Sequence, residues 1–274
     1  MTGPAPLSWS EQRAWLRTRL QQQPPADISP DEVAAHFESM PEHYWARVNE
    51  PDLLWGLETI HGFFRQIASP NVPSTLPLVR WRQAPEQNQT RVMICTWDRQ
   101  GLLAKAAAAF SAVRLNIREA DVFTRLDHVA LDVFTVTEFD GPRAISPTRL
   151  EEMTFLLDGA LSDPPRFASV WACSRHRLLA APNPWTARIT FDNQSSPSST
   201  LLCLEAPDRL GLLYDVLETI ANQGLCVTSA RIETEQDCAH DVIHITDALG
   251  RKVGDPGRLE DLRCCLESAL NIAE

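Results

Sequence analysis

The sequence predicts an α+β protein in which two copies of one domain follow a small helical segment. The stretch beginning WDRQGLLAK at Trp97 and the stretch beginning PDRLGLLYD at Pro207 align without a gap at a spacing of 110 residues. Beyond the next turn the spacing becomes 109, and the register continues as far as Glu151 and Glu260. A register held over that length indicates a duplicated domain.

The first copy is predicted to have the element order β-α-β-β-α. Apolar runs of strand length cover residues 91–96, 116–124 and 129–137, and a short polar turn joins the last two as in a hairpin. Apolar residues at helical spacing predict one helix over 102–113. A second helix is expected after Pro147, because proline is tolerated in the first turn of a helix.

The second copy repeats the same order with equivalent residues. Its strands are predicted at 200–205, 226–234 and 239–246, where β-branched and apolar residues are again enriched. An amphipathic helix is expected after Gly211, and another after Pro256. The same elements are therefore predicted at equivalent positions of the two copies.

Neither copy shows the closing strand of a ferredoxin-like sheet after its second helix. Each is instead preceded by a strand-like stretch, Leu78–Gln83 (LVRWRQ) and Ala187–Asp192 (ARITFD). An antiparallel strand arriving from upstream would fill the vacant sheet edge. We therefore expect two ferredoxin-like domains with antiparallel sheets and helices on one face.

The segment before the repeat is predicted to be helical. Ser29–Glu32 has the pattern of a capping box, and a helical stripe of apolar residues runs from Leu53 to Ile67. Proline-rich residues 69–77 have the composition of a linker. One further helix is expected over Asp163–Leu179, between the copies. The predicted boundaries are 1–75 for the helical segment and linker, 76–180 for domain 1 with its connecting helix, and 181–274 for domain 2.

Composition narrows the classes of partner. Lys and Arg total 25 against 36 Asp and Glu, a formal charge of −11, which argues against nucleic acid and against anionic membrane surfaces as partners. The N-terminus lacks the basic and apolar regions of a secretory signal. The seven cysteines include no Cys-x-x-Cys pair, as expected for reduced residues of a cytoplasmic protein.

The recurring Asp-Arg-x-Gly-Leu turn is the candidate ligand site. Glycine permits positive φ and close approach, and the helix that follows opens with N–H groups that suit a carboxylate. An aspartate beside them suits an ammonium group, so the turn has the groups to recognise a zwitterionic amino acid. The competing interpretation is that the aspartate only caps the helix and the glycine only permits the turn. The candidate residues are Asp98, Arg99, Gln100, Gly101 and Leu102, and their counterparts Asp208, Arg209, Leu210, Gly211 and Leu212.

The order β-α-β-β-α with D-R-x-G-L-L at the first strand–helix turn resembles the ACT domain, a small-molecule sensing module. ARITFDNQSS, LEAPDRLGLLYDVLETIANQGL and TDALGRKVGDPGRLEDLRCCLESAL are similar to the C-terminal ACT pair of bacterial PII uridylyltransferase/uridylyl-removing enzymes. The resemblance covers about residues 38–274, beginning with MPEHYW at Met40, and is stronger in the second copy.

The resemblance implies glutamine as ligand and Asn116 as a ligand contact, with Cys226 at the equivalent position of the second copy. The catalytic signatures of those enzymes do not occur here. No Gly-Ser is followed by paired aspartates, and the only His-Asp step is His240-Asp241, on a predicted core strand. We therefore expect no enzymatic activity, no metal site and no cofactor.

Three functions remain open from the sequence. The first is a non-catalytic amino-acid sensor that acts on an unidentified protein of nitrogen or amino-acid metabolism, with the first turn and Asn116 binding more strongly than the second turn. The second is a protein-interaction or dimerisation module whose ligand sites have decayed. A homo-oligomer is compatible with both, because sheet edges and helix faces readily associate. The third is an enzyme, either a remnant of the PII uridylyltransferase or something unrelated, for which no nucleophile, base or metal set is visible.

Overall fold

The computed structural model describes residues 9–139, 141, 143–161, 187–235 and 238–270. The first repeat consists of β1 (Leu78–Ala84), β2 (Gln89–Trp97), α5 (Leu102–Ala112), β3 (Leu115–Asp121), β4 (Val129–Glu138) and α6 (Pro147–Ala160). The second consists of β5 (Arg188–Asp192), β6 (Thr200–Pro207), α8 (Leu212–Asn222), β7 (Leu225–Glu235), β8 (Cys238–Asp247) and α9 (Pro256–Leu270). The predicted α+β fold and its order of elements are confirmed. The helix expected over Asp163–Leu179 lies outside the described residues.

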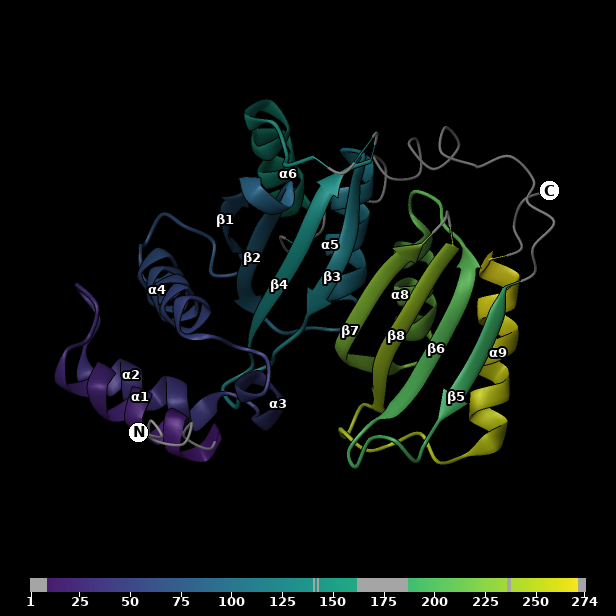
Figure 1. The fold of residues 1–274 in the computed structure, drawn as a ribbon, viewed down its shortest axis with the longest axis horizontal. Coiled ribbons are helices and arrows are strands. Elements are labelled where there is room, and N and C mark those ends of the chain that lie inside the picture. Colours follow the sequence, from purple (N-terminus) through teal and green to yellow (C-terminus); the bar gives the residue numbers. More distant parts are fainter. Residues whose placement is uncertain (1–8, 140, 142, 162–186, 236–237, 271–274) are drawn as a thin grey trace, which may run out of the picture.

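All eight strands belong to one antiparallel sheet, in the order β1-β2-β4-β3-β7-β8-β6-β5 (Figure 1). The two upstream strands occupy its edges as expected, since Leu78 on β1 faces Cys95 and Arg188 on β5 faces Glu205. The two repeats meet in the middle, where Ala120 on β3 pairs with Ala230 on β7. The sequence predicts one sheet for each repeat, and in the structure the two half-sheets form one continuous sheet.

Within the described residues, four helices cover one face of this sheet. Helices α5 and α6 lie over the first half-sheet and α8 and α9 over the second (Figure 1). Their apolar sides and the strands beneath form one continuous core, which includes Phe110, Phe134 and Ile243. This layer is the predicted arrangement of helices on one face.

The N-terminal helices add a third layer on the other face of the first half-sheet only. They are α1 (Trp9–Gln22), α2 (Pro30–Ser39), α3 (Glu42–Trp45) and α4 (Glu50–Ile67). A second apolar cluster joins them to the strands and includes Phe63, Met93 and Leu131. The capping box of α2 is present, with reciprocal hydrogen bonds between Ser29 and Glu32 at 3.2 and 2.8 Å. The expectation of helices on one face is therefore correct for each repeat but not for the whole first half of the molecule.

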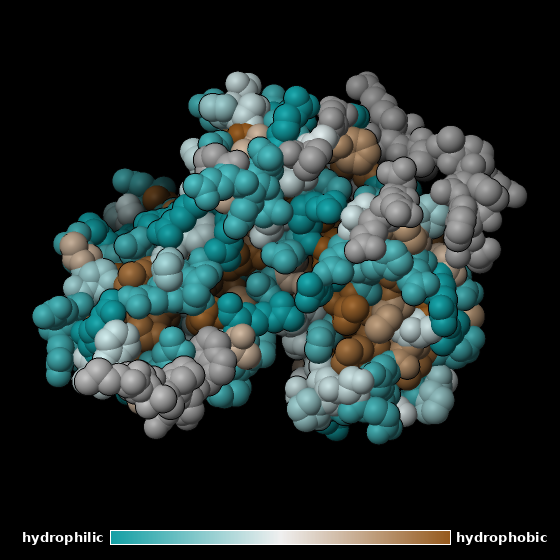
Figure 2. All heavy atoms as spheres, viewed as in Figure 1, coloured by the Kyte–Doolittle hydropathy of each residue, from teal (hydrophilic) through white to brown (hydrophobic). Residues whose placement is uncertain are grey.

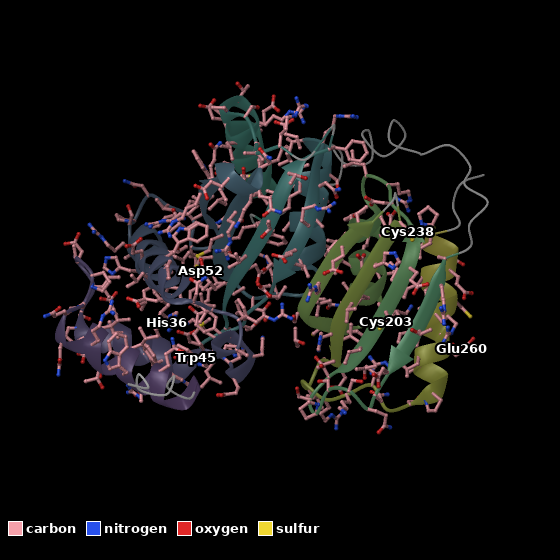
Figure 3. All side chains as sticks on the ribbon, in the orientation of Figure 1. His36, Trp45, Asp52, Cys203, Cys238 and Glu260 are labelled. Carbon is pink, nitrogen blue, oxygen red and sulfur yellow. The ribbon has the colours of Figure 1, made fainter. Side chains whose placement is uncertain are left out.

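The second half-sheet has no such layer among the described residues. Figure 3 places His36 and Trp45 in the N-terminal helices beside the first half, while Cys203 and Cys238 lie on strands β6 and β8 with no helix in front of them. Figure 2 shows apolar surface over this part of the molecule, and Cys203 and Val242 are both partly exposed there. The two repeats thus share a fold but not their surroundings.

Candidate functional site

The first turn (residues 98–102) and the second turn (residues 208–212) each join a central strand to the helix that follows it. Both turns depend on a left-handed glycine, with φ +74° at Gly101 and +85° at Gly211, each at the N-cap position of its helix. An ideal Cβ at Gly101 would meet no atom within 4 Å. The backbone conformation, and not a lack of space, is therefore what requires glycine there.

Each turn lies against the other repeat, because the repeats are joined through β3 and β7. The Gln100 side chain of the first turn donates a hydrogen bond of 2.5 Å to the carbonyl of Ala221, near the end of α8. In the opposite direction, the Arg118 guanidinium on β3 donates to the carbonyl of Thr234 on β7 at 3.3 Å. Residues from both repeats therefore meet at each turn.

The first cavity lies at the first turn and has a volume of about 480 Å³. The turn residues Asp98 to Leu102 line one side, and the start of β7, including Cys226 and Thr228, lines the other. Cavities of roughly 300–1,000 Å³ are typical of small-molecule sites. The first cavity is therefore large enough for a small amino acid.

The second cavity lies at the second turn and has a volume of only about 30 Å³. It is lined by residues 208–212 together with Ser111, Asn116 and Ile117 of the first repeat. The two turns differ in sequence at one position. Leu210 is 7% exposed there, whereas its counterpart Gln100 is exposed, and this residue accounts for the difference in cavity volume. A space this small holds about one water molecule.

The structure does not bring Asn116 to the first turn. Asn116 lines the second cavity beside residues 208–212, and its counterpart Cys226 lines the first cavity. The reason is the antiparallel pairing of β3 with β7 in the middle of the sheet, opposite Ala120 and Ala230. This pairing carries the start of each strand toward the turn of the other repeat.

The two turn aspartates do not cap the helices that follow. The Asp98 carboxylate accepts a hydrogen bond from the Thr124 hydroxyl at 3.3 Å, and Asp208 accepts one from Thr234 at 3.1 Å. No side chain caps α5 or α8 at the N-cap glycines. The first N–H groups of α5 are thus not satisfied by the turn aspartate, which leaves the capping interpretation without support.

The remaining turn residues hold the turns in place within their own repeats. The Arg99 guanidinium donates to the carbonyl of Leu161, and Arg209 forms a 2.6 Å ion pair with Asp215. Leu102 and Leu212, the first residues of α5 and α8, are buried. Their side chains contribute to packing, while the turn backbone, Asp98 and Gln100 border the first cavity.

Sequence reasoning did not single out two buried aspartates at these cavities. Asp132 on β4 lines the first cavity and Asp241 on β8 lines the second, and each is 2% exposed. Burial, and then the neighbouring turn aspartate, raises the pKa of each carboxyl to about 8. The available signal was a carboxyl residue that recurs, in register, inside an apolar strand.

A wider hollow lies between the N-terminal helices and the second half-sheet. Its volume is about 1140 Å³, and Arg13, Arg17 and His244 are among its lining residues. Arg13 and Arg17 already form ion pairs with Glu42 and Glu38, at 3.1 and 2.5 Å. These two cations are neutralised within the helical layer, so the hollow offers less to a ligand than the first cavity does.

The described part of the chain shows neither a candidate metal site nor a candidate membrane-spanning helix. Within it, no three His, Cys, Asp or Glu side chains are grouped so that they could hold a metal ion. None of the helices described combines the length and the apolar character that a bilayer crossing demands.

Comparison with known proteins confirms the resemblance to ACT domains. Residues 188–273 match the family described as ACR9-like, ACT-like domain. The chain is 33% identical over 189 residues to the bifunctional uridylyltransferase/uridylyl-removing enzyme of Azospirillum brasilense, a match that covers 66% of this chain and 20% of that enzyme. It is 28% identical over 254 residues to the enzyme of the same name from Stutzerimonas stutzeri, covering 92% of this chain and 27% of the enzyme.

The chain thus spans only about a fifth to a quarter of the length of these relatives. Among solved structures, an aspartate kinase from Synechocystis aligns with 79% of this chain and 32% of its own, at a TM-score of 0.34 and 14% identity. At that level of similarity the alignment carries no argument about function. The relatives place the similarity in the C-terminal part of the bacterial enzymes.

Proposed function

We propose that this ACT-like domain protein, which is similar to the C-terminal part of bacterial uridylyltransferase/uridylyl-removing enzymes, is a non-catalytic regulator that senses a small amino acid. The ligand is glutamine or another small amino acid, and the partner is a cytoplasmic protein of nitrogen or amino-acid metabolism. The observation that carries this proposal is the first cavity of about 480 Å³, which a glycine turn of one repeat and a strand of the other enclose together.

The chemistry of the first cavity suits a zwitterion. The Leu102 N–H donates to the Arg99 carbonyl at 3.1 Å, but the rest of the first turn of α5 presents backbone N–H groups and the positive end of the helix dipole, which favour a carboxylate. The Asp98 carboxylate at the same turn favours an ammonium group. Thr228 and Thr246, on the strands of the second repeat, supply hydroxyl groups for a polar ligand side chain. Both ends of an α-amino acid thus find partners of opposite charge.

The two cavities lead us to expect one amino acid per chain. The second cavity has the same turn but only about 30 Å³ of space, because buried Leu210 stands where the first turn has exposed Gln100. The second turn, Asp208–Leu212, therefore binds more weakly or not at all. Since the bound ligand would touch both repeats, its binding would stabilise their junction at β3 and β7, where a partner protein could detect the change.

Calorimetric titration of the full chain with each of the twenty standard amino acids tests the proposal. We expect binding at a stoichiometry of one, lost in Gly101→Val because a β-branched residue is strained at φ +74°. Gly211→Val is the matched control, since it places the same strain at the second turn. Binding of none of the twenty at millimolar concentration, or full affinity in Gly101→Val, would contradict the proposal.

The proposal also excludes catalysis. We expect the purified chain neither to transfer uridylyl groups from UTP to a PII protein nor to remove them. Turnover above that of heat-inactivated protein, abolished by a chelator, would show that the chain is an enzyme.

An interaction module is the second candidate, and the closed second cavity favours it. If the first cavity were also without a ligand, the repeats would serve as docking or dimerisation surfaces only. Sedimentation velocity distinguishes the two functions. An assembly state that depends on the amino acid supports the sensor, whereas one that is the same with and without all twenty supports the interaction module.

A further inference from the structure

Asp132 is buried in the apolar core, where a carboxyl group without a partner lowers the stability of the fold. Its neighbours on the same face of β4, Ala130 and Phe134, belong to the apolar core beneath α5. Asp132 is 2% exposed, and its Oδ1 atom is buried without a hydrogen-bond partner. A buried polar atom left without a partner is destabilising by roughly 1–3 kcal/mol. A backbone hydrogen bond from Phe123 favours the ionised carboxyl, but Oδ1 has no partner among the described residues.

The orphaned carboxyl faces the first cavity. Asp132 is among the residues that line it, together with the start of α5 and Val122. The Asp98 carboxylate is close enough to raise the pKa of Asp132 further, after burial. The other titratable or charged groups that line the cavity are Arg99 of the turn, His43 of α3, and Cys226 and Asp247 of the second repeat.

The cationic or titratable nitrogen groups of this cavity contact other residues and not Asp132. The Arg99 guanidinium donates to the Leu161 carbonyl, and the His43 ring is within 3.2 Å of the Val122 carbonyl. Two carboxyls, Asp98 and Asp132, therefore line the cavity close enough to interact, and within the described residues no cationic side chain is hydrogen-bonded or ion-paired to either. A small cation that donates several hydrogen bonds would satisfy both, and an ammonium group has that chemistry.

We propose that Asp132 binds the ammonium group of the amino-acid ligand, and that it releases one proton to solvent when it does so. The inference rests on the proposed function and names the residue that selects for a charged amine. In the empty cavity Asp132 holds its proton, because an ionised carboxylate would be both buried and close to Asp98. On binding, the O–H bond of Asp132 breaks, the proton leaves to solvent, and the carboxylate accepts a hydrogen bond from the ammonium group.

The second repeat provides a built-in comparison. Asp241 is also 2% exposed, and neither of its carboxyl oxygens has a hydrogen-bond partner. It lies under the second cavity, whose volume of about 30 Å³ leaves no room for an amino acid. Asp132 and Asp241 thus have the same burial and a neighbouring turn aspartate each, and differ in access to a ligand.

The test is calorimetry of the full chain with the tightest-binding of the twenty standard amino acids as probe. Titrations at several pH values between 6 and 8, in two buffers with different enthalpies of ionisation, count the protons released. We expect release approaching one proton per ligand at the lower pH values, and an affinity that rises with pH by up to about tenfold per unit. The N-acetyl derivative of the probe, which lacks the ammonium charge, should not bind.

Two matched variants separate ligand binding from structure. Asp132→Asn should abolish the proton release and weaken binding by about 10- to 100-fold, the range for a lost hydrogen bond to a charged group. Asp241→Asn removes the same buried carboxyl from the closed cavity and should leave both readouts unchanged. Because proton release is measured on the unaltered chain, the test holds even if a variant fails to fold.

Binding of the probe without proton release, or equal effects of the two variants, would overturn the role of Asp132 and leave the proposed function standing. Tight binding of the N-acetyl derivative would do the same. If none of the twenty amino acids binds, both the inference and the proposed function fail.

Discussion

The face of the sheet turned away from α5 and α8 differs between the two repeats. In the first half-sheet it presents Met93, Cys95 and Leu131, all at most 1% exposed beneath the N-terminal helices. The repeat register places Cys203, Glu205 and His240 at the equivalent positions, and these are partly or fully exposed. The strands are otherwise paired alike, since β2 lies between β1 and β4 as β6 lies between β5 and β8.

The comparison shows that strand pairing alone does not decide which face receives a third layer, because the two half-sheets are paired alike and the uncovered one mixes polar residues with the partly exposed Cys203 and Val242. An antiparallel sheet tolerates solvent on one side when that side carries polar residues. The second half-sheet has such residues in Glu205 and His240. The first has an apolar surface that is stable in water only when it is covered, and α4 covers it.

The largest expected effect is at the matched pair Leu131 and His240. We expect Leu131→Ala to lower the free energy of unfolding by about 2–5 kcal/mol, because it leaves a cavity beneath the N-terminal helices. His240→Ala should change it by less than about 0.5 kcal/mol, as at most surface positions. Urea denaturation followed by circular dichroism measures both. Equal losses would mean that the two faces are equally buried.

The next effect concerns Asp132 and Asp241, a pair of buried carboxyls at equivalent positions of the two halves. Their pKa of about 8 in the folded chain lies above the usual value near 4. The folded state then binds more protons than the unfolded state between these values, so stability falls as pH rises. We expect a loss of about 2 kcal/mol for each of the two groups between pH 6 and 8.

Urea denaturation at pH 6, 7 and 8 measures this loss, and the double variant Asp132→Asn/Asp241→Asn should remove most of it. A stability that rises over this range would contradict the assigned protonation states.

Exchanging the variable turn residue sharpens the comparison of the two cavities. Gln100→Leu removes the hydrogen bond to Ala221, for which we expect a loss of about 0.5–1.5 kcal/mol. By analogy with Leu210 it should also close the first cavity and abolish binding of the amino acid. Leu210→Gln is the reciprocal change and should open the second. Calorimetric stoichiometry measures both effects. Unchanged binding in Gln100→Leu would show that residue 100 does not determine the size of the first cavity.

The smallest expected effect is within the helical layer itself. Arg17 and Glu38 form a 2.5 Å ion pair between α1 and α2, but their side chains are 38% and 63% exposed. Arg17→Ala should therefore lower stability by no more than about 0.5 kcal/mol. A loss comparable to that of Leu131→Ala would show that ion pairs, and not apolar burial, hold the third layer in place.

Local sequence patterns were sufficient for the elements and their order. The helical stripe after Pro51, the edge strand at Leu78 and the capping box at Ser29 are all present as expected. Each depends on residues within a few turns or one strand of each other, so its signal is complete in a short stretch of sequence. The left-handed glycines at Gly101 and Gly211 follow from the same local chemistry.

Contacts between segments that are distant in the sequence determine which residues line each cavity. The pairing of Ala120 with Ala230 turned two sheets into one, moved Asn116 to the second turn and brought Cys226 to the first. Nothing within either repeat specifies this pairing, because a sheet edge presents the same backbone groups to any strand that approaches it. We infer a role for Asp132 only from its depth in the core and from its Oδ1 atom, which is buried without a hydrogen-bond partner among the described residues. Composition and periodicity do not contain that information, because burial is set by what the whole chain packs against each strand.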